Sequence, residues 1–128
     1  PVCVRRLPRP GGSCALAAAF PPWRVTAAHP GGRLVGEMAA GALHQGNVYW
    51  GLSGWAPKYF PESLRRDVRS RLRDKVMFGS DYPSMPYERI LREWNELGYT
   101  DELMAQIFHG NAERVLGLGR TAAADGTP

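Results

Sequence analysis

Short apolar runs and amphipathic stretches alternate along the middle of the chain. Residues 23–29, 47–53 and 76–79 are rich in β-branched and aromatic side chains, which is typical of buried strands. Each run is followed by a stretch whose apolar residues recur every three to four positions, as in a helix packed on a core: residues 33–45, 62–73 and 86–97. Two further short helices are expected, one after Thr100 and one from Asn111.

Strand followed by helix, three times over, predicts an α/β fold in which parallel strands carry helices on the outside. The predicted strands end at His29, Ser53 and Asp81. The intervals between these strand ends are close to the roughly 31 residues per strand–helix unit that result when about 250 residues build eight such units. We therefore expect part of a (β/α)8 TIM barrel, with three parallel strands and flanking helices in an incomplete barrel.

Both ends of the chain differ from this pattern. Proline and glycine interrupt residues 1–22, so we expect a poorly ordered segment there that does not belong to the domain. Residues 119–128 are small and polar, which is typical of a flexible tail. The predicted domain therefore covers residues 23–118.

Composition narrows the classes of function. A chain of 128 residues that is 44% hydrophobic suits one globular domain, and no apolar run is long enough to cross a membrane. The net charge is +4, with five arginines at 65–73 on the side of a predicted helix that faces solvent, so we expect no nucleic-acid partner. Cys3 and Cys14 form no Cys-x-x-Cys pair, which favours a reducing, cytoplasmic location.

Polar residues follow all three predicted strands. Because the carboxyl ends of parallel strands meet at one edge, His29, Ser53 and Asp81 are expected at that edge. Asp81 would bind a divalent metal or take a proton, and His29 would act as a general base or polarise a carbonyl. The alternatives are a turn-forming Asp81 ahead of Pro83 and a His29 that only neighbours a glycine-rich turn. Two residues also do not complete a catalytic zinc site, which normally has three protein ligands.

Other candidates carry weaker signals. His44 and His109 lie near predicted helix C-termini, where a favourable helix dipole or surface exposure explains them. Trp55 and residues 58–60 either line a pocket above the sheet or pack against its rim. Asn111 is expected to cap a helix rather than to belong to a site.

Four stretches, in order, resemble the amidohydrolase-related family that includes aminocarboxymuconate-semialdehyde decarboxylase and the resorcylate decarboxylases. They are AHPGG at 28–32, NVYWGLSGWAPKYFP at 47–61, KVMFGSDYP at 75–83 and HGNAERVLGL at 109–118. The family fold is a metal-dependent (β/α)8 barrel. The resemblance implies that this chain is the C-terminal part of such a barrel and that its three predicted strands are the sixth, seventh and eighth.

The resemblance also implies roles for individual residues. Asp81 matches a metal ligand at the end of the last strand, and His29 matches an acid or base beside the metal. Ser53 and Trp55 match positions near the substrate. The implied cofactor is a divalent metal, expected to be zinc, with manganese in some members. The implied reactions are hydrolysis or decarboxylation of a small cyclic or ring-derived carboxylic acid, and both chemistries use the same residues.

The chain departs from the family pattern in its metal ligands. Nothing here matches the His-x-His or Glu-x-His pair of the first strand, or the histidine of the fifth. We therefore expect the chain to be inactive alone and to need a second copy or a missing N-terminal half. The alternative is a non-catalytic remnant, or a partner subunit of a split barrel.

Overall fold

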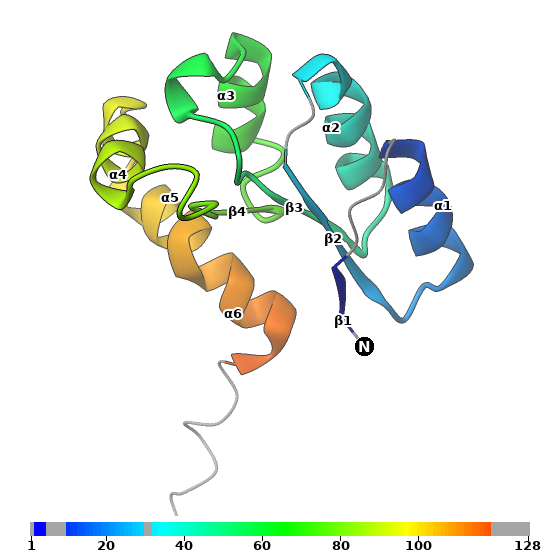
Figure 1. Ribbon diagram of the computed structural model, residues 1–128. Helices are drawn as coiled ribbons and strands as arrows, with labels where there is room; N and C mark the ends of the chain where they lie inside the picture. Colours follow the sequence, from blue (N-terminus) through cyan, green and yellow to red (C-terminus); the bar gives the residue numbers. More distant parts are fainter. Residues whose placement is uncertain (1, 5–9, 30–31, 119–128) are drawn as a thin grey trace, which may run out of the picture.

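The computed structural model describes residues 2–4, 10–29 and 32–118 of the chain (Figure 1). Four strands form one sheet in the order β1-β2-β3-β4, and every neighbouring pair is parallel. The strands are β1 (Val2–Val4), β2 (Arg24–Ala28), β3 (Val48–Gly51) and β4 (Val76–Met77). The last three are the predicted strands, so the α/β prediction with three parallel strands is confirmed. The sheet does not close into a barrel within the described residues.

Each of the first three strands leads into a helix on the same side of the sheet, as Figure 1 shows. These helices are α1 (Pro10–Ala19), α2 (Val35–His44) and α3 (Glu62–Arg69). Short turns precede two of them, η1 (Gly32–Leu34) and η2 (Pro57–Tyr59). After β4 come α4 (Tyr87–Glu96), α5 (Asp101–Ala105), the π-helical turn η3 (Gln106–Gly110) and α6 (Asn111–Leu116).

The N-terminal segment differs from the irregular structure expected for residues 1–22. β1 pairs with β2 in the register Val2↔Arg24, and α1 packs closely against α2. Pro10 is the first residue of α1, a position where proline costs no hydrogen bond and its φ suits the helix. The interrupting proline thus marks where a helix begins. Residues 5–9 and the predicted tail at 119–128 lie outside the described residues.

The core lies between the sheet and its helices. Along β2 and β3, fully buried residues alternate with half-buried ones, because successive side chains point to opposite faces of the sheet. Val25, Val48 and Trp50 face the helices, whereas Thr26 and Tyr49 lie on the other face. Aromatic rings pack at the α4 end of this core around buried Trp94, which makes edge-to-face contacts with Phe60, Phe78, Tyr99 and Phe108.

Lys75 joins the start of β4 to the end of α2. Its Nζ donates hydrogen bonds to the carbonyl oxygens of Gln45 at 3.1 Å and Gly46 at 2.6 Å, and lies 4.9 Å from the centre of the Tyr49 ring. Burial lowers the pKa of Lys75, and the nearby Arg114 guanidinium lowers it further. A cation at this point interacts favourably with the carbonyl oxygens just beyond the C-terminal end of α2.

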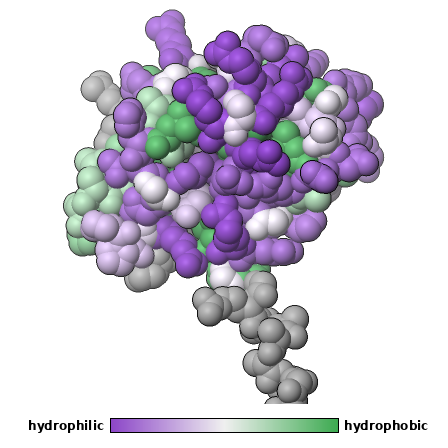
Figure 2. Space-filling view, turned by 180° about the vertical axis from the view of Figure 1, so that it is seen from behind, coloured by the Kyte–Doolittle hydropathy of each residue, from purple (hydrophilic) through white to green (hydrophobic). Residues whose placement is uncertain are grey.

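The face seen in Figure 2 is mainly hydrophilic, with small hydrophobic areas between charged groups. Arginines in and after α3 are engaged within the molecule. Arg71 pairs with Asp67 at 2.8 Å, and Arg69 donates to the carbonyl of Leu97 at 3.3 Å. No helix in the described part of the chain has both the length and the apolar character needed to span a bilayer.

Candidate active site

His29 and Asp81 meet at the carboxyl edge of the sheet. His29 directly follows β2 and Asp81 lies in the loop after β4, and the distance from His29 Nε2 to Asp81 Oδ1 is 3.9 Å. Their side chains are 32% and 37% exposed, so a small molecule can reach both. The structure therefore brings together the two residues that the sequence placed at one edge, as parallel strands require.

Both residues adopt a backbone conformation that side chains disfavour. φ is +65° at His29 and +55° at Asp81, and these are the two non-glycine residues with positive φ in the described ranges. Backbone hydrogen bonds hold them: the His29 amide donates to the Gly51 carbonyl at 3.1 Å, and the Ser84 amide donates to the Asp81 carbonyl at 2.8 Å. Left-handed residues other than glycine cluster at functional sites, where the surrounding structure maintains the strain.

Ser53 contacts the other nitrogen of the His29 ring. His29 Nδ1 lies 2.9 Å from the Ser53 carbonyl oxygen and 3.1 Å from Ser53 Oγ. A carbonyl oxygen only accepts hydrogen bonds, so Nδ1 carries the hydrogen. In the neutral ring the lone pair is then on Nε2, the nitrogen nearer Asp81. Histidines that bind metals or move protons are commonly oriented in this way by an acceptor behind the ring.

The other predicted candidates make contacts of their own. Trp55, which follows Gly54, is half-buried and meets Phe60 edge to face at 5.8 Å. His109 forms an exposed ion pair with Glu113 at 3.3 Å. His44 is exposed at the end of α2.

Asn111 is buried at the start of α6, but its role is not that of a cap. Its side-chain Nδ2 donates to the carbonyl oxygens of Arg73 at 2.8 Å and Val76 at 2.7 Å. Sequence reasoning missed this contact because the acceptors are main-chain atoms far away in the sequence. Gly54 was missed as well, although it adjoins Ser53 and has φ of +73°.

The donor types of His29 and Asp81 suit a divalent metal, but their number does not complete a catalytic site. No group of three His, Cys, Asp or Glu side chains that could hold an ion occurs among residues 2–4, 10–29 and 32–118. Catalytic zinc normally takes three protein ligands. A catalytic zinc at this place would therefore need a protein ligand in addition to His29 and Asp81.

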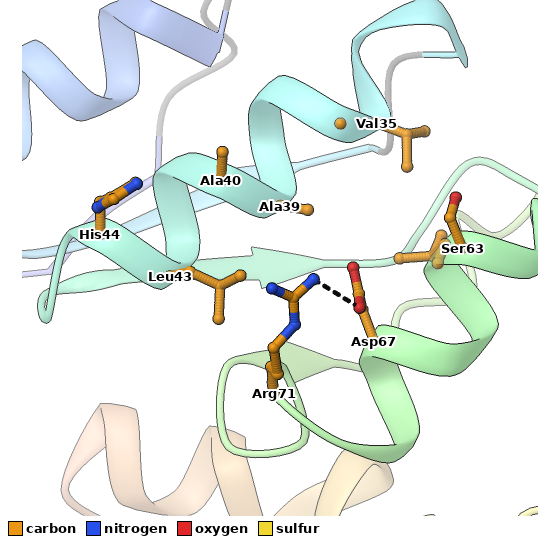
Figure 3. Close-up of a pocket in the computed structure, with 10 residues that line it drawn as sticks. Val35, Ala39, Ala40, Leu43, His44, Ser63, Asp67 and Arg71 are labelled. Atoms are coloured by element: carbon orange, nitrogen blue, oxygen red, sulfur yellow. Dashed lines mark hydrogen bonds and ion pairs between the residues drawn. The ribbon is translucent and has the colours of Figure 1, made fainter.

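A cavity of about 310 Å³ lies elsewhere, between α2 and α3 (Figure 3). It is lined by Leu43 and His44 on α2 and, on the other side, by Leu64 and the Asp67–Arg71 ion pair, and Leu43 points towards Arg71 in Figure 3. Neither His29 nor Asp81 lines this cavity, so it is a groove between outer helices and not part of the His29–Asp81 site.

Comparison with known proteins agrees with this architecture. The chain is similar to an uncharacterized TIM-barrel protein from Bordetella bronchiseptica, with 24% identity, a TM-score of 0.78, and coverage of 91% of this chain and 44% of that one. A dihydroxybenzoic acid decarboxylase from Polaromonas, solved with manganese and the inhibitor 2-nitroresorcinol, is 17% identical, with a TM-score of 0.62 and coverage of 86% and 38%. An amidohydrolase 2 from Bifidobacterium longum subsp. infantis is 20% identical, with a TM-score of 0.64 and coverage of 91% and 48%.

The chain spans less than half the length of each of these three proteins. Their fold confirms the expectation of a partial TIM barrel. Curated proteins yielded no match. The family model described as amidohydrolase matches residues 15–118, which include α2, α3 and both His29 and Asp81. Together with the parallel sheet and its helices, this match shows that the chain belongs to the amidohydrolase family.

Proposed function

We propose that His29 and Asp81 form the acid–base part of the active site of a metal-dependent hydrolase or decarboxylase. The substrate is a small cyclic or ring-derived carboxylic acid. The observation that carries the proposal is the 3.9 Å approach of His29 Nε2 to Asp81 Oδ1, with His29 Nδ1 held by Ser53. The aromatic inhibitor bound to the Polaromonas decarboxylase supports the substrate class.

His29 is the proton-transfer residue of this proposal. With its hydrogen on Nδ1, the neutral ring accepts a proton at Nε2, from water in a hydrolysis or from a substrate hydroxyl. The resulting imidazolium returns that proton to a leaving group or to a ring carbon that has lost carbon dioxide. The Asp81 carboxylate, 3.9 Å from Nε2, stabilises the charged ring.

Asp81 also provides one ligand to a divalent metal, for which we expect zinc. The remaining ligands come from outside the described residues. One carboxylate holds zinc weakly, because catalytic zinc normally has three protein ligands, so we propose that the chain is inactive alone. The same shortage of donors supports a second candidate, a non-catalytic remnant or a partner subunit of a split barrel.

Turnover and metal content test these proposals together. The purified chain, assayed with zinc or manganese on hydroxybenzoates and cyclic carboxylic acids, should release no product. Stoichiometric zinc in the purified chain, together with turnover, would contradict the proposal that the chain is inactive alone. Sequencing the coding DNA upstream of Pro1 separates the two candidates, because an in-frame His-x-His strand favours an enzyme.

A protein completed with such a segment should turn over substrate. His29→Gln should then lower kcat by about 10²–10⁴-fold, the range for loss of a general acid–base group. His109→Gln, which changes an exposed histidine, is the matched control. Full activity in His29→Gln would exclude the proposed role.

A further inference from the structure

We propose that Ser53, Gly54 and Gly79 form a positioning unit that fixes the tautomer and orientation of His29. Ser53 is then a positioning residue that acts through the ring of His29. The catalytic meaning of the unit rests on the proposed function, whereas its effect on the His29 ring is independent of turnover.

Gly54 leaves the space that the imidazole ring of His29 occupies. A Cβ built on Gly54 would overlap His29 Nδ1 and lie 2.7 Å from Cε1 and 3.0 Å from Cγ. The ring therefore lies directly against the bare backbone of the residue that follows Ser53. Because Gly54 also has φ of +73°, both space and conformation call for glycine here.

Gly79, which follows β4, packs closely against Ser53. A Cβ on Gly79 would lie 2.6 Å from Ser53 Cβ and 3.3 Å from Ser53 Oγ, closer than side chains tolerate. Contacts thus run from the end of β4 through Ser53 to His29 after β2. The loop then reaches Asp81 two residues beyond Gly79.

The acceptor that selects the tautomer is a main-chain atom. The Ser53 carbonyl lies 2.9 Å from His29 Nδ1, and the side-chain hydroxyl adds a second contact at 3.1 Å. The tautomer of His29 consequently depends more on the position of the Ser53 main chain than on the Ser53 hydroxyl. Ser53→Ala should keep the tautomer, and a side chain at position 79 should disturb it.

Long-range proton–nitrogen NMR of the histidine rings measures the tautomer directly, without substrate or metal. The chain has three histidines, and His29→Gln assigns the signals of His29. At alkaline pH, where histidines are neutral, His29 should show a protonated Nδ1 and an unprotonated Nε2. A hydrogen predominantly on Nε2 in the unmodified chain would overturn the proposal at once, with no variant required.

Variants test the path of contacts. Gly79→Ala should move His29 to a mixture of tautomers, and Ser53→Gly in the same chain should restore the original one, because it removes the obstructing Cβ and keeps the carbonyl. Gly46→Ala is the matched control, since nothing lies within 4 Å of that Cβ. An unchanged tautomer in Gly79→Ala, or no restoration in the double variant, would contradict the unit.

The result is separable from the proposed function. If His29 shows the expected tautomer but His29→Gln leaves the completed protein fully active, only the catalytic role of His29 is refuted. A wrong tautomer in the unmodified chain would refute the positioning unit and the use of Nε2 as proton acceptor, whereas the kcat of His29→Gln in the completed protein would still test separately whether His29 takes part in catalysis.

Discussion

The side-chain amide of Asn111 donates a 2.7 Å hydrogen bond to the carbonyl oxygen of Val76. It also donates to the Arg73 carbonyl at 2.8 Å. One buried side chain from α6 thus secures the start of the strand whose far end leads to Asp81. This contact gives the asparagine in the HGNAERVLGL stretch a physical role: it holds β4 in place.

Asn111→Ala should therefore destabilise the chain. The substitution removes both hydrogen bonds and leaves the buried Val76 carbonyl without this donor, and a buried unsatisfied group costs about 1–3 kcal/mol. We expect the free energy of unfolding, measured in urea, to fall by about 2–4 kcal/mol. Asn95→Ala, on the exposed surface of α4, should change it by less than about 0.5 kcal/mol. Equal effects of the two substitutions would exclude the proposed role of Asn111.

Glu93 should make stability depend on acid pH. Burial opposes ionisation of this carboxyl, but the Arg89 guanidinium at 2.9 Å and the Lys58 amide at 3.4 Å outweigh burial and hold the pKa of Glu93 below its usual value. A lowered pKa stabilises the folded state above the ordinary glutamate pKa of 4.5, and this stabilisation is lost as the pH falls through the folded value.

Urea unfolding between about pH 7 and pH 3 checks this effect, since that range brackets the ordinary glutamate pKa. The loss of stability on acidification should be smaller in Glu93→Gln than in the unmodified chain. Glu96→Gln is the control, because Glu96 is exposed and pairs with Arg92 only at 3.8 Å. An acid dependence that is the same with and without Glu93 would contradict the prediction.

The close approach of α1 to α2 predicts an effect at Gly41. A Cβ on Gly41 would overlap the sulfur of Cys14, so Gly41→Ala should lower the free energy of unfolding by about 1–3 kcal/mol. Cys14→Ala in the same chain should recover part of that loss. Gly36→Ala, where nothing lies within 4 Å, should instead stabilise α2 by about 0.5 kcal/mol. A harmless Gly41→Ala would mean that α1 does not pack as described.

Periodicity and strand order were enough to predict much of the fold. The apolar runs ending near His29, Ser53 and Asp81 became parallel strands β2, β3 and β4, because buried strands and amphipathic helices leave strong local patterns. The structure of residues 2–4 and 10–19 was not predicted. A three-residue strand has too short a pattern, and Pro10 resembles a breaker until its place at the start of α1 is known.

The candidate site was only partly predictable for a related reason. Adjacency of His29 and Asp81 follows from the rule that parallel strands end at one edge. The acceptor on His29 Nδ1 is a main-chain carbonyl, and Gly54 and Gly79 act through the side chain that they lack. Such contacts depend on exact placement of the backbone, which residue types do not encode individually.

Manganese-induced broadening of NMR signals tests most directly whether Asp81 holds a divalent metal next to His29. Even weak binding of this paramagnetic ion broadens the signals of nearby nuclei. Broadening should centre on residues 29, 53–54 and 81, and Asp81→Asn should abolish it. Glu113→Gln, which removes an exposed carboxylate beside His109, should leave it unchanged. Broadening that centres on His109, or that persists at His29 in Asp81→Asn, would contradict the site.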